Sequence, residues 1–125
     1  MKYIIAIILN IFITISLMAR ATDISQEEML KMQITDKEMI LLDVRTPAEF
    51  SQGHIKGAIN ITHTDIQSML KELPKDKKVV LYCRSGRRAG VVANILAPKG
   101  YNNLYHLDGD MILWNANKRP VITKE

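Results

Sequence analysis

Cysteine is nearly absent from this 125-residue sequence, in which Cys83 is the only one. A single thiol cannot form a disulfide within its own chain, so the sequence excludes a small fold stabilised by internal disulfides. In a protein exported to an oxidising compartment, an odd cysteine either crosslinks two chains or is a reactive thiol. The other interpretation of Cys83 is a small residue of the hydrophobic core, which is the common fate of free cysteines.

A strong excess of charge of one sign is also lacking. The chain has 17 basic and 13 acidic side chains, and its formal net charge is +4. Removal of residues 1–21 would take away Lys2 and Arg20 and lower this net charge to +2. Such a small excess does not predict binding to nucleic acid. The positive charge is concentrated at Arg84, Arg87 and Arg88, a cluster that suits a small anionic substrate better than a polyanion.

Long hydrophobic runs are absent except near the N-terminus, where the run Tyr3–Met18 follows Lys2 and precedes Ala19-Arg20-Ala21. A basic start, an apolar core and an A-x-A site are typical of a secretory signal peptide. We therefore predict that residues 1–21 are a signal peptide, that residues 22–125 are one domain, and that the protein is periplasmic. An uncleaved membrane anchor is the alternative, because the run approaches the lower limit for a membrane span. Three polar side chains within the run favour cleavage: Asn10, Thr14 and Ser16.

Short apolar runs of strand length alternate with segments that carry helix signals. Four such runs are expected to be strands: Met39–Asp43, Ala58–Ile61, Val79–Tyr82 and Asn103–Leu107. Helices are expected to begin near five residues: Ser25, Thr46, Thr64, Gly86 and Asp110. This alternation predicts an α/β domain with a mainly parallel central sheet and helices on both faces.

Capping patterns and apolar spacing define the expected helices. Ser25 with Glu28 and Thr46 with Glu49 have the spacing of a capping box, and Pro47 suits the first helical position. The helix that begins at Thr64 is expected to bury four side chains: Ile66, Met69, Leu70 and Leu73. The helix from Gly86 is expected to present four others to the core and to end near Pro98 and Gly100: Val91, Val92, Ile95 and Leu96. The polar segment from Lys118 is expected to wrap the surface or to fray.

Cys83 directly follows a buried strand and precedes a turn that opens a helix. In parallel sheets, ligands bind beyond the carboxyl ends of the strands, and Asp43 ends a second strand at the same edge. A helix N-terminus and nearby arginines favour the thiolate, which is the reactive form of cysteine. Gly86 allows the backbone amides of residues 84–88 to turn inward as a nest for an anion. The local pattern therefore favours a reactive cysteine that can hold an anionic persulfide.

The stretch Cys83–Arg88 resembles the six-residue active-site loop of the rhodanese-type sulfurtransferases. Two further stretches resemble signatures of that family, namely Leu41–Ile61 (LLDVRTPAEFSQGHIKGAINI) and Leu104–Trp114 (LYHLDGDMILW), so that the similarity extends over roughly residues 24–117. The resemblance implies a rhodanese-like α/β fold and an enzyme that needs no cofactor. It also implies a soluble monomer similar to the small periplasmic phage-shock-type rhodaneses.

The same resemblance implies the reaction and the site residues. Cys83 would be the catalytic nucleophile, which takes a sulfane sulfur from a small anionic donor such as thiosulfate and passes it to cyanide or to a thiol. The donor would be bound by the loop residues that follow the cysteine: Arg84, Ser85, Gly86, Arg87 and Arg88. The arginines favour an anionic donor independently of the resemblance.

Other residues near the expected site have two interpretations each. Asp43 is either an acceptor that fixes the active-site loop or, with Arg45 and Glu49, part of a brace for the start of a helix. In the first interpretation Arg45 would pair with Glu49 across the first helical turn. His54 is expected to be a packing residue rather than a base, because an activated thiolate needs none. His63 and His106 lack metal-ligand spacing with each other and with Cys83, so no metal site is predicted.

The C-terminal stretch agrees with the family signature except at one position. Trp114 matches the tryptophan of the signature and is expected to lie in the core. Asp110 stands where the family commonly has a second glycine, so the geometry of this last loop is expected to differ.

Two other functions share parts of this pattern. Phosphatases and arsenate reductases related in fold or loop have an arginine six positions after their cysteine. In this chain the sixth position after Cys83 is Ala89, and Arg88 is the fifth, so the loop is expected to be too short for phosphate or arsenate. A persulfide carrier or binding module for a protein partner, with a protein thiol as acceptor, is the non-enzymatic alternative.

Overall fold

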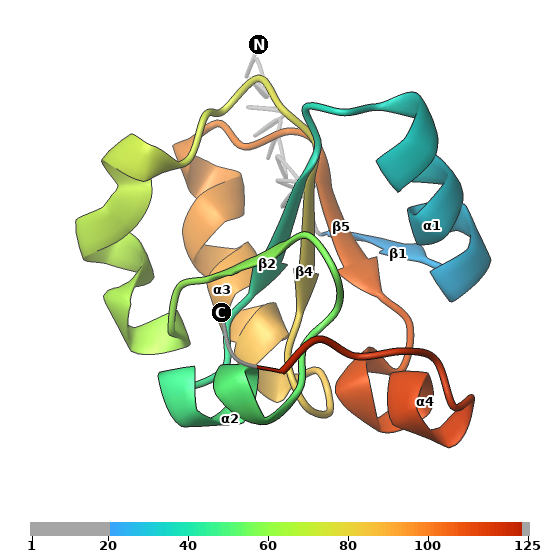
Figure 1. Ribbon diagram of the computed structural model, residues 1–125. Helices are drawn as coiled ribbons and strands as arrows, with labels where there is room; N and C mark the ends of the chain where they lie inside the picture. Colours follow the sequence, from blue (N-terminus) through green and yellow to red (C-terminus); the bar gives the residue numbers. More distant parts are fainter. Residues whose placement is uncertain (1–20, 124–125) are drawn as a thin grey trace, which may run out of the picture.

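The structure is a computed structural model that describes residues 21–123. Its centre is a sheet of five parallel strands in the order β1-β5-β4-β2-β3 (Figure 1). The strands are β1 (Thr22–Ile24), β2 (Ile40–Asp43), β3 (Ala58–Asn60), β4 (Val79–Tyr82) and β5 (Leu104–Leu107). The parallel sheet and its four main strands confirm the predicted α/β fold. The edge strand β1 was not predicted.

Helices cover both faces of the sheet, as predicted. The α-helices are α1 (Gln26–Thr35), α2 (Pro47–Gln52), α3 (Arg87–Leu96) and α4 (Asp110–Ala116), and the 3-10 helices are η1 (His63–Glu72) and η2 (Ala97–Lys99). In Figure 1, η1 and α3 lie on the left of the sheet, and α1 lies on its right. The helices α2 and α4 lie below the sheet, where the strand arrows end.

Alternating strand residues contribute to two hydrophobic cores. Leu42 and Leu81 face η1 and α3, where they pack with a cluster that includes Ile66, Leu73, Val92 and Leu96. Leu41 and Tyr82 face α1 and α4, where they pack with a cluster that includes Met29, Met111 and Trp114. All four residues of β4 are fully buried, as expected for the central strand of a parallel sheet.

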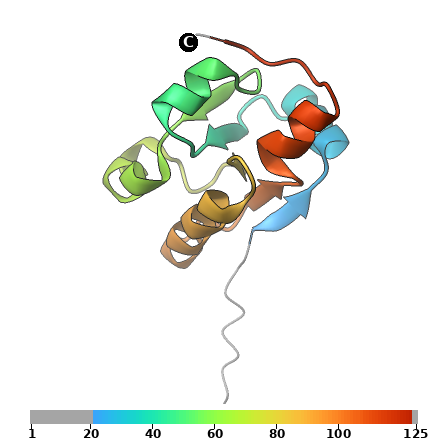
Figure 2. The same cartoon turned by 90° about the horizontal axis from the view of Figure 1, so that it is seen from below.

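The carboxyl edge of the sheet brings two predicted site residues to neighbouring strands. Asp43 at the end of β2 is in register with Tyr82 at the end of β4, so Cys83 is the first residue beyond the edge. Seen from below in Figure 2, α2, α4 and the start of α3 surround this edge. The fold thus places the Cys83 turn between three helices.

Two details of the helices differ from the predictions. The segment predicted as a helix capped at Thr64 is the 3-10 helix η1, whose N-cap residue is Thr62 without a side-chain cap bond. In α3, Val91 was expected in the core but is 44% exposed. The buried face of α3 is instead formed by residues at helical spacing: Ala89, Val92, Ala93 and Leu96.

The C-terminal segment wraps the surface, which is one of the two predicted outcomes. After α4 it runs toward α2, as Figure 2 shows, and Ile122 forms an antiparallel bridge with His54.

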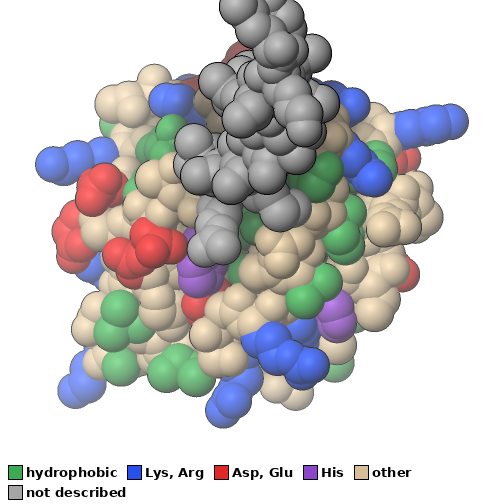
Figure 3. All heavy atoms as spheres, turned by 180° about the vertical axis from the view of Figure 1, so that it is seen from behind, with side chains coloured by type: hydrophobic (Ala, Val, Ile, Leu, Met, Phe, Trp, Pro, Cys, Tyr) green, Lys and Arg blue, Asp and Glu red, His purple; other side chains and the backbone are tan. Residues whose placement is uncertain are grey.

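The predicted signal peptide lies outside the described residues, except for Ala21. None of the helices in residues 21–123 combines the length and the apolar character that crossing a membrane requires. On the face seen in Figure 3, most Lys and Arg side chains stand apart around the rim.

Candidate active site

The Cys83 turn is held by backbone contacts on two sides. The amide of Gly86 donates a hydrogen bond to Cys83 Sγ over 3.0 Å. The amide of Met111 donates to the Cys83 carbonyl over 3.1 Å, and that of Ile112 donates to the Arg84 carbonyl over 3.2 Å. Cys83 is only 1% exposed. The sulfur therefore faces an amide donor within its own loop, while the start of α4 fixes the loop backbone.

Gly86 is required where the turn becomes helix α3. Its φ of 107° lies in the left-handed region, which glycine adopts without steric cost. A Cβ atom at this position would also lie 3.1 Å from Asp110 Oδ2 and 3.3 Å from His106 Cε1. Because Gly86 is the N-cap residue of α3, Cys83 lies at the positive end of this ten-residue helix. Both the conformation and the crowding favour glycine here.

Arg88 is committed to a carboxylate on helix α2. Its guanidinium donates two hydrogen bonds to Glu49, over 2.6 Å to Oε1 and 2.9 Å to Oε2. This bidentate contact is the main reason that the pKa of Glu49 is lowered to about 2. Glu49 also completes a capping box with Thr46. The pair joins the active-site loop to α2, and the role of Arg88 as a donor ligand stays a prediction.

Asp43 and Arg45 form a buried ion pair beside the site. The Arg45 Nη2 group donates to Asp43 Oδ2 and to the Gly53 carbonyl, each over 2.7 Å, and Nε donates to both carboxylate oxygens. The interpretation in which Arg45 pairs with Glu49 is wrong, because Arg45 binds Asp43 and Glu49 binds Arg88. The contact predicted between Asp43 and the loop is also not seen among the described residues, where the Asp43 carboxylate bonds to Arg45.

The buried pair lies against the last residue of β4. The Arg45 guanidinium is 5.8 Å from the centre of the Tyr82 ring. Burial, together with the nearby Asp43 carboxylate, raises the pKa of Tyr82. The Tyr82 hydroxyl accepts a hydrogen bond from the Ile55 amide over 3.2 Å. Asp43 and Arg45 thus support the end of β4, directly before Cys83.

The remaining predicted loop residues are open to solvent. Arg84, Ser85 and Arg87 are all exposed. Among residues 21–123, neither Arg84 nor Arg87 forms an ion pair. The structure therefore separates the predicted cluster of three arginines into one paired and two uncompensated cations. The uncompensated ones are the guanidinium groups available to an anion.

Sequence reasoning missed the contact of Asp110 with Cys83. Asp110 is 1% exposed, and its Oδ1 atom accepts a hydrogen bond from the Cys83 amide over 2.9 Å. His106 Nε2 lies 3.0 Å from each oxygen of the same carboxylate. Two signals were present in the sequence, namely the departure from glycine at position 110 and the spacing of four residues between His106 and Asp110.

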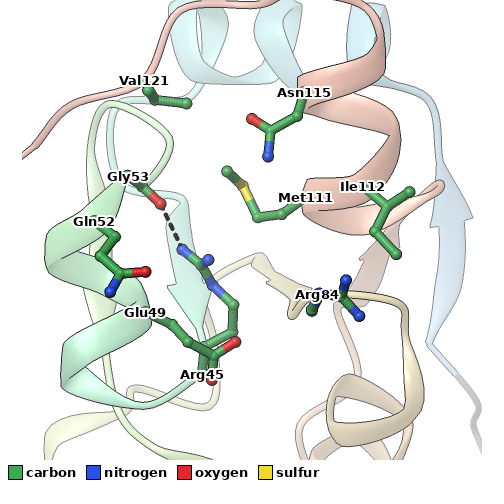
Figure 4. A pocket seen from close by; sticks show the side chains of 9 residues that line it. All are labelled: Arg45, Glu49, Gln52, Gly53, Arg84, Met111, Ile112, Asn115 and Val121. Atoms are coloured by element: carbon green, nitrogen blue, oxygen red, sulfur yellow. Dashed lines mark hydrogen bonds between the residues drawn. The ribbon is translucent and has the colours of Figure 1, made fainter.

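A cavity of about 510 Å³ opens beside the loop (Figure 4). Glu49 and Gln52 of α2 line one side, and Met111 and Asn115 of α4 line the other. Arg84 contributes a cation at the loop side. The full lining also includes Arg45, Gly53, Ile112 and Val121. Its mixture of charged, amide and apolar groups suits a small polar ligand with an apolar part.

The histidine and tryptophan predicted as packing residues have that role. His54 is 3% exposed and stacks on Phe50 with 3.6 Å between ring centres. Its Nδ1 atom lies 2.7 Å from the Phe50 carbonyl oxygen. Trp114 is 2% exposed and donates from Nε1 to the Pro120 carbonyl. In residues 21–123 no group of three His, Cys, Asp or Glu side chains is arranged to hold a metal ion.

Known proteins are similar to this chain in sequence. The family model of the rhodanese-like domain matches residues 25–117. A sulfurtransferase of Allochromatium vinosum is 38% identical over 99 residues, which are 78% of this chain and 92% of that protein. A Schizosaccharomyces pombe protein named "Putative thiosulfate sulfurtransferase, mitochondrial" is 36% identical over 93 residues, covering 64% of this chain and 66% of its own length.

The fold agrees with a solved structure of the same kind. A rhodanese-related protein of Thermoplasma volcanium superposes with a TM-score of 0.73 at 27% identity, over 82% of this chain and 99% of that one. The family match also covers the carboxyl edge with Asp43, the Cys83 loop and helix α4. The chain therefore belongs to the rhodanese-like family, as a single rhodanese-like domain.

Proposed function

We propose that the protein is a thiosulfate sulfurtransferase that carries a sulfane sulfur on Cys83. The observation that carries this proposal is the Gly86 amide, which lies 3.0 Å from Cys83 Sγ at the N-terminus of α3. An amide donor and a helix dipole both stabilise negative charge on sulfur. A thiolate and a terminal persulfide sulfur are anions of this kind. The sulfurtransferase names of the relatives support the same chemistry.

The reaction consists of two displacements at sulfur. The Cys83 thiolate attacks the outer sulfur of thiosulfate, a new S–S bond forms, and the bond between the two thiosulfate sulfurs breaks as sulfite leaves with its electron pair. Cyanide then attacks the terminal sulfur of the persulfide, and the Cys83 thiolate leaves as thiocyanate forms. A thiol acceptor would take the sulfur in the same way. Covalent transfer of this type predicts ping-pong kinetics.

The intact mass of the protein tests the first displacement. Incubation with thiosulfate is expected to add the mass of one sulfur atom, and later addition of cyanide is expected to remove it. Cys83→Ser should show neither change, because a hydroxyl is too weakly nucleophilic to replace the thiolate. An unchanged mass of the wild-type protein would falsify the proposed function.

Binding of the donor is assigned to the uncompensated cations of the loop. Arg84→Ala removes the guanidinium that lines the cavity, so we expect the KM for thiosulfate to rise by about fivefold to tenfold, which corresponds to the net contribution of one typical hydrogen bond at an exposed site. The free energy of unfolding should not change, since Arg84 is exposed. Lys99→Ala removes a distant exposed cation and is the matched control. Equal KM values for the two variants would exclude Arg84 from donor binding.

A protein thiol is the second candidate acceptor. Ile112 and Val121 line the cavity and are 50% and 39% exposed, so the cavity is bordered by apolar surface that cyanide cannot use. Transfer from the persulfide to a panel of small and protein thiols, measured against transfer to cyanide, compares the two acceptors. Faster transfer to a protein thiol would favour a carrier role, and cyanide as the faster acceptor would favour the simple enzyme.

Phosphate chemistry is the weaker alternative, because Arg88 is the fifth residue after Cys83 and is bound to Glu49. Hydrolysis of an aryl phosphate that disappears in Cys83→Ser would reverse this order.

We also propose that residues 1–21 direct export to the periplasm. Cell fractionation and N-terminal sequencing test this, and a membrane-bound protein that retains Lys2 would contradict cleavage.

A further inference from the structure

His106 and Asp110 form a side-chain pair directly behind the active-site loop. His106 Nε2 must carry a proton to donate to the two Asp110 oxygens, each at 3.0 Å. The Asp110 Oδ1 atom also accepts from the Cys83 amide at 2.9 Å. A single carboxylate therefore links the imidazole to the backbone of the reactive cysteine.

The backbone at Asp110 has a left-handed conformation. Its φ is 52°, a left-handed value that glycine adopts freely and that Asp adopts more often than most other residues. Glycine would relieve the backbone at this position. Strain retained at a site beside a reactive group is typical of a functional constraint.

We propose that Asp110 and His106 are positioning residues that hold the Cys83 turn and set the electrostatic potential at its sulfur. With His106 protonated, the carboxylate and the imidazolium compensate each other, so the sulfur lies beside a neutral pair. With His106 neutral, the Asp110 carboxylate remains beside Cys83 without its cation. The second state disfavours a thiolate, a persulfide anion and an anionic donor, because all three bring negative charge to the loop.

The charged groups that face His106 are two carboxylates. Asp110 on α4 and Asp23 on β1, whose Oδ1 atom is 3.5 Å from His106 Nδ1, are the charged ones. From the loop the facing residue is Gly86, and from α3 the residues that share a cavity with His106 carry no titratable group: Ala89, Gly90, Ala93 and Asn94. The hydrogen bond to Asp110 raises the pKa of His106. The change of state therefore lies above the ordinary histidine pKa of about 6.5.

Alkylation of Cys83 measures the potential at the sulfur without any sulfur transfer. Iodoacetate is an anion and iodoacetamide is neutral, while both react with the thiolate. The ratio of their rate constants therefore cancels the ionisation of Cys83 and reports the local charge. In the wild type we expect the ratio to fall by roughly threefold to tenfold as His106 loses its proton, the effect of one unit charge a few ångströms away in a partly solvated site.

Two variants separate this proposal from a structural role. His106→Gln keeps a side-chain donor for Asp110 but cannot titrate, so the ratio should be low and independent of pH. Asp110→Asn keeps the shape and removes the charge, so the ratio should be higher than in the wild type at high pH. Its inflection should also move to lower pH, because the hydrogen bond to the Asp110 carboxylate is the main cause of the raised pKa of His106. NMR titration of the His106 ring gives the pKa independently.

Two control variants remove similar groups outside the contact with Cys83. His63→Gln removes an imidazole from η1, and the ratio should depend on pH as it does in the wild type. Asp23→Asn removes the exposed carboxylate and should only shift the inflection slightly downward. A flat wild-type ratio, or an inflection that persists in His106→Gln, would overturn the proposal.

The relevance of the pair to catalysis rests on the proposed function, in which Cys83 accepts sulfur. The positioning role and the proposed function are tested separately, because alkylation of Cys83 needs no sulfur donor. A protein that takes up no sulfur from thiosulfate but shows the expected ratio would disprove the proposed function and keep the positioning pair.

Discussion

The two flanks of the Cys83 loop hold carboxylates in different ways. On the side of β2 and α2, Asp43 and Glu49 each bind an arginine through two or more hydrogen bonds. On the side of β5 and α4, Asp110 binds an imidazole and the amide of Cys83. An arginine keeps its charge at every pH that a protein experiences, whereas an imidazole does not.

Because of this difference, the charge on one flank of the Cys83 loop is constant at physiological pH, and the charge on the other flank changes with pH. The arginine pairs brace the strand end and the start of α3 at any physiological pH. The imidazole pair lies closest to the Cys83 backbone, and its net charge depends on one proton. Three substitutions test this division, in order of decreasing expected effect.

Asp43→Asn is expected to cause the largest loss. It leaves the Arg45 guanidinium, which is 6% exposed, without a counterion, and breaking a buried pair in this way costs about 3–5 kcal/mol of unfolding free energy. Urea denaturation measures the loss. Glu38→Gln removes a carboxylate that is 3.8 Å from Lys77 and mostly exposed, and this control should cost less than about 0.5 kcal/mol. Equal losses would show that Asp43 does not brace the site.

Glu49→Gln is expected to have an intermediate effect. Glutamine can still complete the capping box with Thr46, so only the ion pair with Arg88 is lost, at a cost of about 1 kcal/mol in this partly exposed setting. Because the pKa of Glu49 is lowered in the folded state, its stabilisation is present above pH 4.5 and is lost as the pH falls toward about 2.

The stability difference between the wild type and Glu49→Gln should therefore shrink across that acid range. Glu28→Gln is the matched control, since Glu28 has the same position near Ser25 in α1 and no arginine partner among the described residues. A pH-independent difference for Glu49→Gln would mean that the ion pair contributes nothing.

His106→Gln is expected to have the smallest effect on stability, below about 1 kcal/mol for a half-buried charge pair. The pKa of His106 is raised in the folded state, so its contribution is full below the ordinary pKa of 6.5 and is lost as the pH rises through the raised value. In thermal unfolding between pH 5 and pH 9, the stabilities of the wild type and of His106→Gln should become equal at the alkaline end. If the stability difference between the two proteins grew toward alkaline pH, the folded protein would not stabilise the imidazole as a cation.

The sequence was sufficient for the parts of the fold that depend on local patterns. Apolar runs located β2–β5, capping boxes located α1 and α2, and the change from strand to glycine-containing turn located Cys83 at the sheet edge. The strand β1 was missed because it has three residues, of which only Ile24 is buried, and its partner β5 lies about 80 residues later in the chain.

The partners of charged side chains could not be predicted in the same way. Arg45 and Glu49 have helical spacing, but Arg45 precedes α2, and its side chain turns back to Asp43 at the end of β2. The bond between Arg88 and Glu49 spans 39 residues, and the bond between Cys83 and Asp110 spans 27. Which of several candidate partners is within reach depends on the packing of whole elements, and spacing along the chain does not contain that information.

The segment after α4 contributes to the cavity from outside the shared domain. His54 and Ile122 exchange two backbone hydrogen bonds, of 2.9 and 2.8 Å, and Val121 lines the cavity next to Gly53. This segment follows residue 117, where the match to the family model ends. One residue of the cavity lining, Val121, therefore comes from chain that lies outside the shared domain. A change at Val121 can therefore alter the lining of the cavity, while β4, the loop and Cys83 stay unchanged.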